Sequence, residues 1–318
     1  MTTPELAAPA FDVNFPLAVP LVSGDDERAE WLEARKGLIT ASEVPAILGL
    51  VPGGPRLWYE KRGLLEREDL SAIEAVQMGH DLEPINAQLF ARKTQRRVQR
   101  SQLLYRSREY PWLGATLDYA QWDTTLHGED AGVLECKSTG NKDNWPEDGE
   151  PATHYQAQLQ TQLLVVGSNW GSLSAIIGSP AMHHRHLDYE KHAGFCELVL
   201  DKTYEFWKSL ADGNPPVDDT VDTNEALRHL ALGALAGTTT MLRPEATEWT
   251  EQWLEAKKQL AEIEKQRRYY ENLLMTAIGS HDTAALCDGR TFTFKEARRK
   301  AYSVAESWYR VLRFKNKL

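Results

Sequence analysis

The stretch GATLDYAQWDTTLHGEDAGVLECKS, residues 114–138, decides the fold because it sets acidic side chains inside two apolar runs joined by a turn. The first run carries Asp118, and the second carries Glu135, Cys136 and Lys137. Both runs are typical of β-strands, and the segment between them is rich in turn residues. Since strand side chains alternate, Glu135 and Lys137 share one face and Cys136 points to the other. We expect Asp118 at a pleat position that faces the adjacent strand.

This arrangement suits metal-assisted hydrolysis of a phosphodiester bond. Two carboxylates that converge from neighbouring strands form an oxygen site of the kind that Mg²⁺ prefers. A lysine beside them can polarise an attacking water molecule and offset charge on a phosphoryl oxygen. An acid followed by Glu-x-Lys also occurs by chance in many chains of this length, so the surrounding sequence must support the interpretation.

The remaining periodicities predict a mixed α/β core. Apolar residues at helical spacing predict helices in residues 25–50, 54–63, 75–95, 152–167 and 191–213, the last ending at Gly213. Runs rich in β-formers predict strands in residues 96–107, 110–123, 131–139, 170–178 and 183–190.

The last hundred residues have a different character. Apolar side chains follow a 3-4 spacing that Arg267 alone interrupts, which predicts a long amphipathic helix of coiled-coil type. Its members are Trp253, Ala256, Leu260, Ile263, Tyr270, Leu274 and Ala277. An Asp-Gly turn in residues 284–297 predicts a hairpin, and residues 309–318 form a basic tail. Three roles stay open for the helix: pairing with a partner helix, packing on the core, or extending the DNA path.

We therefore expect a weakly structured lead-in at residues 1–25, a core at 26–218 and a helical, basic extension at 219–318. The N-terminal residues lack the basic and apolar regions of a secretory leader, and no apolar run approaches about 20 residues. These features predict a cytoplasmic protein without a membrane span.

Charge and cysteine content limit the possible functions. The net charge of −10 differs from that of a protein that coats nucleic acid. Basic residues gather after residue 256 and in residues 92–100, where they form either a polyanion-binding stripe or ordinary solvated surface. The three cysteines are far apart, which argues against a disulfide framework and an iron–sulfur cluster.

Four sequence blocks, in this order, resemble the YqaJ/lambda-exonuclease family of phage recombination exonucleases, within the PD-(D/E)xK nuclease superfamily. They are RKGLITASEVPAILGL, MGHDLEPINAQLF, LGATLDYA with VLECKS, and HYQAQLQTQLLVVG. The resemblance covers roughly residues 31–216. It implies a restriction-endonuclease-like core, with a mixed central sheet flanked by helices, followed here by the helical extension and short hairpin.

The resemblance also implies roles for single residues. The metal, Mg²⁺ or Mn²⁺, would be bound by Asp118, Glu135, the backbone carbonyl of Cys136 and Glu83. Lys137 would contact the attacking water or the scissile phosphate.

In the same resemblance, Gln158 would position the catalytic groups, with Tyr155 behind it. Arg35 and Ser42 would bind a terminal 5′-phosphate or the DNA backbone, and Tyr155 would lie on the DNA side. Each residue also has an ordinary structural interpretation, such as a helix cap for Ser42, a core position for Tyr155 or a surface position for Gln158.

The same holds for the remaining residues of these blocks. Arg35 fits an exposed helix cation, Glu83 fits an acid in the first turn of a helix, and Cys136 fits a small buried apolar residue.

The implied activity is 5′→3′ digestion of linear double-stranded DNA that leaves 3′ overhangs for recombination by single-strand annealing. Expected partners are DNA ends, a single-strand annealing protein and further copies of the chain, a trimer by family analogy. The expected setting is a bacterial host that carries a phage or prophage.

Three alternatives stay open. An endonuclease of the same fold would cut closed circles, and a non-catalytic DNA-end-binding scaffold would bind without cutting. A third possibility is a zinc site in the histidine-rich strand, where His184 and His186 share a face.

Overall fold

A computed structural model describes residues 13, 15–24, 27–68, 70–146, 149–178, 182–216, 228, 239 and 241–296. The chain divides into two compact units between Leu232 and Gly233. The expected boundary at residues 218–219 and the basic tail at 309–318 lie outside the described residues.

One sheet of the first unit has four strands in the order β1-β4-β5-β2. Its strands are β1 (Ala18–Ser23), β4 (Leu103–Ser107), β5 (Leu113–Thr116) and β2 (Ile39–Thr40). β2 and β5 run parallel, and the other neighbours are antiparallel. β1 comes from the lead-in that we expected to be weakly structured, so this expectation is wrong for Ala18–Ser23. Pairing with β4 supplies the order that the local sequence does not predict.

The other sheet has five strands in the order β3-β6-β7-β8-β9. They are β3 (Arg97–Arg100), β6 (Tyr119–Trp122), β7 (Gly132–Thr139), β8 (Trp170–Gly178) and β9 (Met182–Glu190). β7 and β8 are parallel, and the remaining pairs are antiparallel. Helix α5 (Thr153–Val166) makes the crossover that two parallel neighbours require.

The run at residues 110–123, expected as one strand, is split between the two sheets. β5 ends at Thr116 and β6 begins at Tyr119, so Leu117 and Asp118 form the passage from one sheet to the other. Asp118 lies at a bend, and its predicted pleat position is therefore wrong. The alternation of the sequence does not reveal that the two strands join different sheets.

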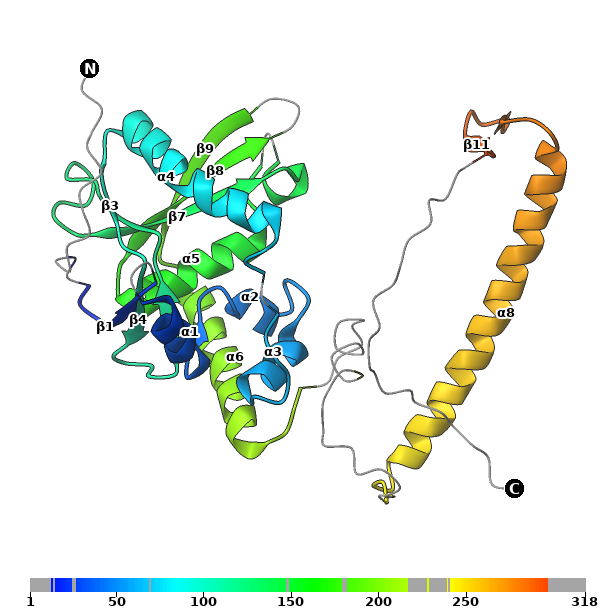
Figure 1. Cartoon of the computed structure of the whole chain (residues 1–318), viewed down its shortest axis with the longest axis horizontal. Helices are drawn as coiled ribbons and strands as arrows, with labels where there is room; N and C mark the ends of the chain where they lie inside the picture. The colour runs from blue at the N-terminus through cyan, green and yellow to red at the C-terminus, as the bar shows by residue number, and fades with distance from the viewer. Residues whose placement is uncertain are drawn as a thin grey trace. The chain divides into compact units, whose positions relative to one another are not determined.

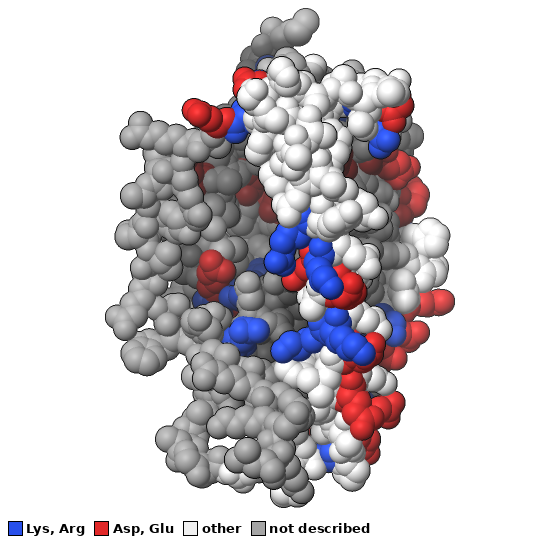
Figure 2. Space-filling model, turned by 90° about the vertical axis from the view of Figure 1, so that its right-hand side faces the viewer, with Lys and Arg blue, Asp and Glu red and all other residues white. Residues whose placement is uncertain are grey.

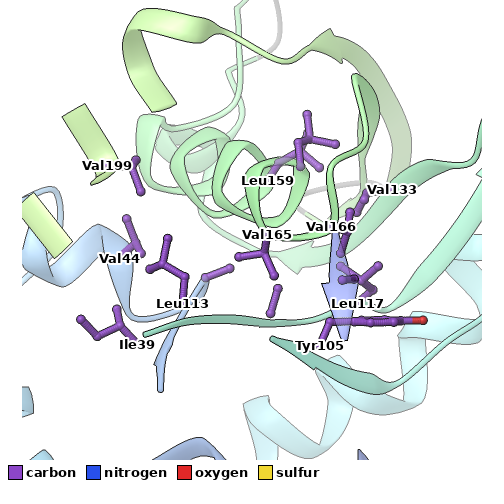
Figure 3. Packing of buried hydrophobic residues seen from close by; sticks show 14 of the residues in the cluster. Ile39, Val44, Tyr105, Leu113, Leu117, Val133, Leu159, Val165, Val166 and Val199 are labelled. Carbon is purple, nitrogen blue, oxygen red and sulfur yellow. The ribbon is translucent and has the colours of Figure 1, made fainter. Parts of the chain in front are cut away.

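Helices cover both faces of the five-stranded sheet (Figure 1). Helix α4 (Glu74–Thr94) buries Phe90 and Ala87 against Tyr119 and Leu134. Helix α5 packs on the other face, where Leu159, Val165 and Val166 meet side chains of the four-stranded sheet in the main core (Figure 3). The other described helices of the first unit are α1 (Arg28–Lys36), α2 (Val44–Ile47), α3 (Gly54–Lys61), η1 (Lys142–Asn144) and α6 (Ala193–Asp212).

The second unit contains α8 (Ala246–Ile278) and the hairpin β10 (Thr283–Ala285) with β11 (Thr291–Thr293). Gly289, at φ 88°, supplies the left-handed residue of the predicted Asp-Gly turn. The predicted fold class, a mixed sheet flanked by helices with a helical extension and a short hairpin, is confirmed. Among the described helices, none is both long and apolar enough to cross a membrane.

The expected basic stripe at residues 92–100 is only partly a surface feature. Arg96 is 8 % exposed and donates to both carboxylate oxygens of Asp188, at 2.8 and 2.7 Å. Its Nε donates to Asp123 at 2.9 Å. Arg100 lies 3.6 Å from Glu83. Arg96 therefore ties α4 to the sheet, and its charge is not available to a polyanion.

Candidate active site

Asp118 lies where the chain passes from the four-stranded to the five-stranded sheet. Its Oδ2 accepts a hydrogen bond from the backbone N–H of Cys136 on β7, at 2.9 Å. Its own carbonyl accepts from Ser101 N–H, also at 2.9 Å. One bond thus holds the carboxylate and the other holds the backbone of Asp118, and the carboxylate lies next to the Glu-x-Lys strand, as the sequence predicts.

Glu135 and Lys137 share the face of β7 that meets α5. Lys137 Nζ donates to Glu135 Oε1 at 2.6 Å and to Gln158 Oε1 at 2.9 Å. Gln158 Nε2 donates to the same Glu135 oxygen at 2.6 Å. The lysine amine also lies 5.3 Å from the centroid of the Tyr155 ring. The structure therefore brings these four predicted residues together.

Gln162 belongs to the same group, although the sequence did not single it out. It is fully buried one turn beyond Gln158, and its Nε2 donates to Glu135 Oε2 at 2.6 Å. The same nitrogen lies 3.2 Å from the carbonyl of Thr116, two residues before Asp118. The Q-x-Q-x-Q spacing from residue 158 was the available signal, because i and i+4 share a helix face.

Glu83 comes to the site from α4 and is held through a turn. Gln102 Nε2 donates to Glu83 Oε1 at 2.8 Å, and Gln102 N–H donates to the carbonyl of Leu117. Helix α4 begins at Glu74, so Glu83 lies in its third turn. The alternative of an ordinary first-turn acid is therefore wrong.

Gln102 has a positive φ of 50°, a backbone conformation that residues other than glycine rarely adopt. Such strain persists only where surrounding contacts determine it, and it clusters at functional sites. Here the turn between β3 and β4 places the Gln102 amide between Glu83 and the Asp118 segment.

Negative charge is concentrated around Asp118. Burial and the carboxylates of Glu135 and Glu83 raise the pKa of Asp118 well above its ordinary value. Burial alone would lower the pKa of Lys137, but Glu135 and Asp118 keep it above its ordinary value. Lys137 is therefore a cationic donor at neutral pH, not a base.

The donor chemistry of these residues fits a hard divalent cation. Asp118, Glu135 and Glu83 supply carboxylate oxygens, and a bound cation would relieve the repulsion that raises the pKa of Asp118. In their present rotamers, the described His, Cys, Asp and Glu side chains form no group of three arranged around one ion position.

Cys136 contributes its backbone to the site and its side chain to packing. The thiol packs against the cluster of Phe90, Tyr119 and Leu134 beneath α4. Burial raises the pKa of this thiol well above its ordinary value, so it stays protonated. Cys136 is half-buried with its thiol packed against this cluster, so the interpretation as a small buried apolar residue is confirmed only in part.

Asn86, one turn after Glu83, fastens α4 to β7, the strand that carries Glu135 and Lys137. Its Nδ2 donates to the carbonyls of Lys137 and Ser174, at 3.0 and 2.9 Å. Ser174 Oγ donates to Asn86 Oδ1 at 2.7 Å, and His184 Nε2 lies 3.1 Å from that oxygen. The ring nitrogen expected as a possible zinc ligand is thus engaged in this buried network.

Arg35 and Ser42 meet beside β2, an edge strand of the four-stranded sheet. Arg35 Nη2 donates to Ser42 Oγ and to Thr40 Oγ1, each at 3.1 Å. The guanidinium lies 4.4 Å from the Trp31 ring, and Arg35 is 9 % exposed, so it is not a free surface cation. Ser42 is exposed and does not cap α2 through its side chain.

The Arg35 guanidinium is linked to the segment before Asp118 through Trp31 and Thr116. Trp31, beneath the guanidinium, donates from Nε1 to Thr116 Oγ1 at 3.1 Å. Thr116 precedes Asp118 by two residues and accepts from Gln162 through its carbonyl. The predicted phosphate-binding pair and the predicted metal site therefore lie at the two ends of one short segment.

A buried ion pair beneath Arg35 was not recognised in the sequence. Lys61 Nζ lies 2.9 Å from Glu43 Oε2, with both side chains 4 % exposed. Lys61 also donates to the Arg35 carbonyl, and Glu43 Oε2 accepts from Thr40 N–H. Burial opposes ionisation of Glu43, but the charges of Lys61 and Arg35 lower its pKa below the ordinary value. This pair fixes the loop that carries Thr40 and Ser42.

Comparisons with known proteins agree with the four blocks. Residues 30–169 match the family described as the YqaJ-like viral recombinase domain. The chain is 28 % identical to the uncharacterized protein YqaJ of Bacillus subtilis (strain 168) over 253 residues, 77 % of this chain and 76 % of that protein. The resemblance recognised in the sequence is therefore confirmed.

Two solved structures are similar at low identity. An alkaline exonuclease (LHK-Exo) from Laribacter hongkongensis has a TM-score of 0.49 at 22 % identity and covers 58 % of this chain and 93 % of its own. A phage-related exonuclease from Haemophilus somnus 129PT has a TM-score of 0.42 at 9 % identity and covers 55 % and 94 %.

Proposed function

Because residues 30–169 match the family described as the YqaJ-like viral recombinase domain, we propose that the chain is a metal-dependent exonuclease of linear double-stranded DNA. The observation that carries the proposal is the convergence of Asp118, Glu135 and Lys137 at the junction of the two sheets. Two acids beside a protonated lysine are the groups that hydrolysis of a phosphodiester needs.

In this proposal Asp118, Glu135 and Glu83, with the Cys136 carbonyl, hold Mg²⁺ or Mn²⁺. The ion would neutralise phosphoryl charge and help to form the attacking hydroxide. Lys137 donates to the attacking water or to a phosphate oxygen, since its pKa keeps it protonated. Gln158 and Gln162 hold the Glu135 carboxylate in the orientation that binding requires.

We further propose that digestion runs 5′→3′ and that Arg35 and Ser42 bind the 5′ end of the strand being digested. A terminal 5′-phosphate would lie against Arg35 and the exposed Ser42 hydroxyl, since charge-assisted donors are the strong phosphate ligands. The hydrogen bond from Trp31 to Thr116, two residues before Asp118, supports a position of this end near the carboxylate cluster. A 3′ overhang would remain as the product.

Two parts of the proposal rest on the family resemblance alone. One is recombination with a single-strand annealing protein that binds the exposed 3′ strand. The other is a ring of three nuclease cores around the duplex. Both concern the cytoplasm of a bacterium that carries the phage or prophage.

The test is digestion of one linear duplex, labelled separately at each 5′ and 3′ end, in Mg²⁺ or in EDTA, alongside a closed circle. We expect release of the 5′ label in Mg²⁺, an intact circle and no release in EDTA. Asp118→Ala and Lys137→Ala should lose at least a hundredfold in rate. Wild-type rates in these variants would remove the site assignment, and a cut circle would favour an endonuclease.

A substitution at Ser42 tests the proposed binding of the 5′-phosphate separately. Because Ser42 is exposed, Ser42→Ala should fold normally. We expect the variant to lose most of the preference for 5′-phosphorylated over 5′-hydroxyl ends and to keep its rate on the hydroxyl substrate. An unchanged preference would contradict phosphate binding at this position.

A further inference from the structure

Helix α8 presents a row of large apolar side chains, and its remaining surface is mostly charged or polar apart from the exposed Leu254, Tyr269, Leu273 and Met275. Its exposed apolar residues include Trp249 at 60 %, Leu260 at 57 %, Ile263 at 61 % and Tyr270 at 62 %. Figure 2 shows the side on which α8 is drawn, with Lys and Arg side chains gathered in the middle of the view, Asp and Glu side chains mainly towards one edge, and few charged side chains above them. A helix with such a row is stable when a second apolar surface covers it.

The row follows a heptad repeat, with positions named a to g. The a positions are Trp253, Leu260, Arg267 and Leu274, and the d positions are Trp249, Ala256, Ile263, Tyr270 and Ala277. Side chains at a and d form the contact seam of a coiled coil, which points to another helix as the cover. The single cation at an a position is a device that sets register and orientation in coiled coils.

We propose that α8 pairs antiparallel with α8 of a second copy of this chain, so that Leu260 of each copy lies beside Ile263 of the other. This inference concerns a surface outside the nuclease site and does not depend on the proposed activity.

Side-chain size supports this register. In an antiparallel pair, each a residue faces a d residue of the other helix. Setting Leu260 against Ile263 sets Arg267 against Ala256, the smallest residue type of the seam. The long stem of Arg267 can then lie over the small side chain with its guanidinium in water. It already reaches Glu271 of its own helix, at 3.3 Å.

The aromatic residues of the seam are also distributed evenly in this register. Trp253 faces Tyr270, and Leu274 faces Trp249. Each large residue thus meets another apolar residue, and no two cations meet within the seam.

Charge supports the same register. The charged e positions beside the seam are Lys257, Glu264 and Glu271, and all three are exposed. In an antiparallel pair, e positions face e positions, and here Lys257 of each copy comes next to Glu264 of the other. Because the pair has two-fold symmetry, this attraction occurs twice.

Other arrangements of two α8 helices lose these matches. In a parallel pair, Arg267 would face Arg267, and the g positions beside e are glutamines, so no opposite charges would meet. Sliding the antiparallel pair by one heptad in one direction brings Lys257 against Lys257. Sliding it in the other direction brings Glu264 against Glu264 and Arg267 against Ile263.

Charge reversal on the full-length chain tests the contact. Lys257→Glu and Glu264→Lys should each weaken the pairing on the order of tenfold, because attraction becomes repulsion in two places. The double variant should restore the wild-type association constant within about threefold. Lys258→Glu is the matched control, since it makes the same charge change at the next residue, on the outer f position.

The measurement is sedimentation equilibrium, with helix content followed by circular dichroism. At a concentration between the dissociation constants of wild type and variant, each single reversal should lower the average mass towards that of the unpaired protein, and the control should not. Equal masses for wild type, both single reversals and the control at this concentration would overturn the proposal.

Cross-linking tests the register directly. A chain with Lys257→Cys is mixed with a chain that carries Glu264→Cys and a mass tag, both in a Cys287→Ser background because Cys287 is exposed. A short bis-maleimide should join one chain of each kind. The same mixture made with Lys258→Cys should give no such product. Absence of the mixed product from a paired protein would overturn the antiparallel register.

Discussion

At the scale of single residues, the site depends on the donors that hold the Glu135 carboxylate. Lys137 and Gln158 share one oxygen, and Gln162 alone among the described residues donates to the other. Glu135 is 3 % exposed, so its charge cannot rely on bulk water. Hydrogen bonds to a charged group contribute about 1.5–3 kcal/mol each.

The first prediction concerns Gln162. Gln162→Leu removes the donor to Glu135 Oε2 and keeps the side chain's approximate volume. We expect kcat on linear DNA to fall about tenfold to a hundredfold, since an ill-held Glu135 binds the metal poorly. The KM for DNA should change little. The measurement is steady-state digestion over a range of DNA concentrations.

Gln160→Leu is the control for this variant. Gln160 lies on the same helix and is also buried, but it bonds to the Glu190 carbonyl and to His192 N–H. We expect a similar loss of folding stability and a wild-type kcat. Equal losses of kcat in both variants would show that Gln162 acts through stability alone.

At the scale of elements, α4 is fastened to the sheet by the network of Asn86, Ser174 and His184. Ser174 Oγ and Asn86 Oδ1 both lie within hydrogen-bonding distance of His184 Nε2, at 2.9 and 3.1 Å. Ser174 uses its proton on Asn86, so the proton of His184 belongs on Nε2. Nδ1 is buried without a hydrogen-bond partner. A proton on Nδ1 would therefore be unsatisfied.

The second prediction follows from this network. Burial, with Lys93 and His186 nearby, lowers the pKa of His184 from 6.5 to about 4. Since the folded pKa is depressed, the unfolded chain binds more protons between pH 6.5 and 4. The contribution of neutral His184 to stability is therefore present above pH 6.5 and lost as the pH falls towards 4. We expect urea unfolding to show a smaller stability loss over this range in His184→Gln than in wild type.

His183→Gln is the control because its side chain is exposed on the same strand. It should keep the wild-type pH dependence of unfolding. If His184→Gln and wild type lost the same stability between pH 6.5 and 4, the network would not be the source.

The third prediction concerns the parallel pair β7–β8. A Cβ on Gly132 would lie 2.6–2.7 Å from the ring of Trp170, which is buried at the start of β8. Gly132→Ala should destabilise the fold by about 1–3 kcal/mol through overpacking, measured by urea unfolding. Gly178→Ala, at the end of β8, has no heavy atom within 4 Å of its added Cβ and should cost much less. Equal costs would contradict the close approach.

Local patterns predicted the elements whose order is local. Helical spacing predicted α4, α5 and α6, the last with its glycine cap, and alternation predicted the shared face of Glu135 and Lys137. They did not predict that Asp118 lies between two sheets. They also did not reveal the partners of Asn86 and Gln102, because Asn86 contacts Lys137 across 51 residues and no local period encodes such a contact.

At the scale of the whole molecule, repulsion between the carboxylates of the site destabilises the folded state, and the rest of the fold compensates for this loss of stability. Three carboxylates lie near one another, and burial with the charges of Glu135 and Glu83 raises the pKa of Asp118. A group whose folded pKa is raised contributes stability below its unfolded pKa, near 3.8, and that stability is lost as the pH rises through the folded pKa. At neutral pH, where Asp118 of the unfolded chain is ionised, the raised pKa of Asp118 therefore lowers the free energy of unfolding, a trade-off expected of active sites.

The last prediction is the sign of two matched substitutions in EDTA at pH 7. Asp118→Asn removes the repelled charge and keeps an oxygen that can accept from Cys136 N–H, so we expect a melting temperature a few degrees above wild type, with activity lost. Asp123→Asn removes a charge that pairs with buried Arg96 and should lower the melting temperature. Mg²⁺ should raise the melting temperature of wild type and of Asp123→Asn, but much less that of Asp118→Asn. A lower melting temperature for Asp118→Asn than for wild type in EDTA would show that the three carboxylates do not repel one another in the folded protein.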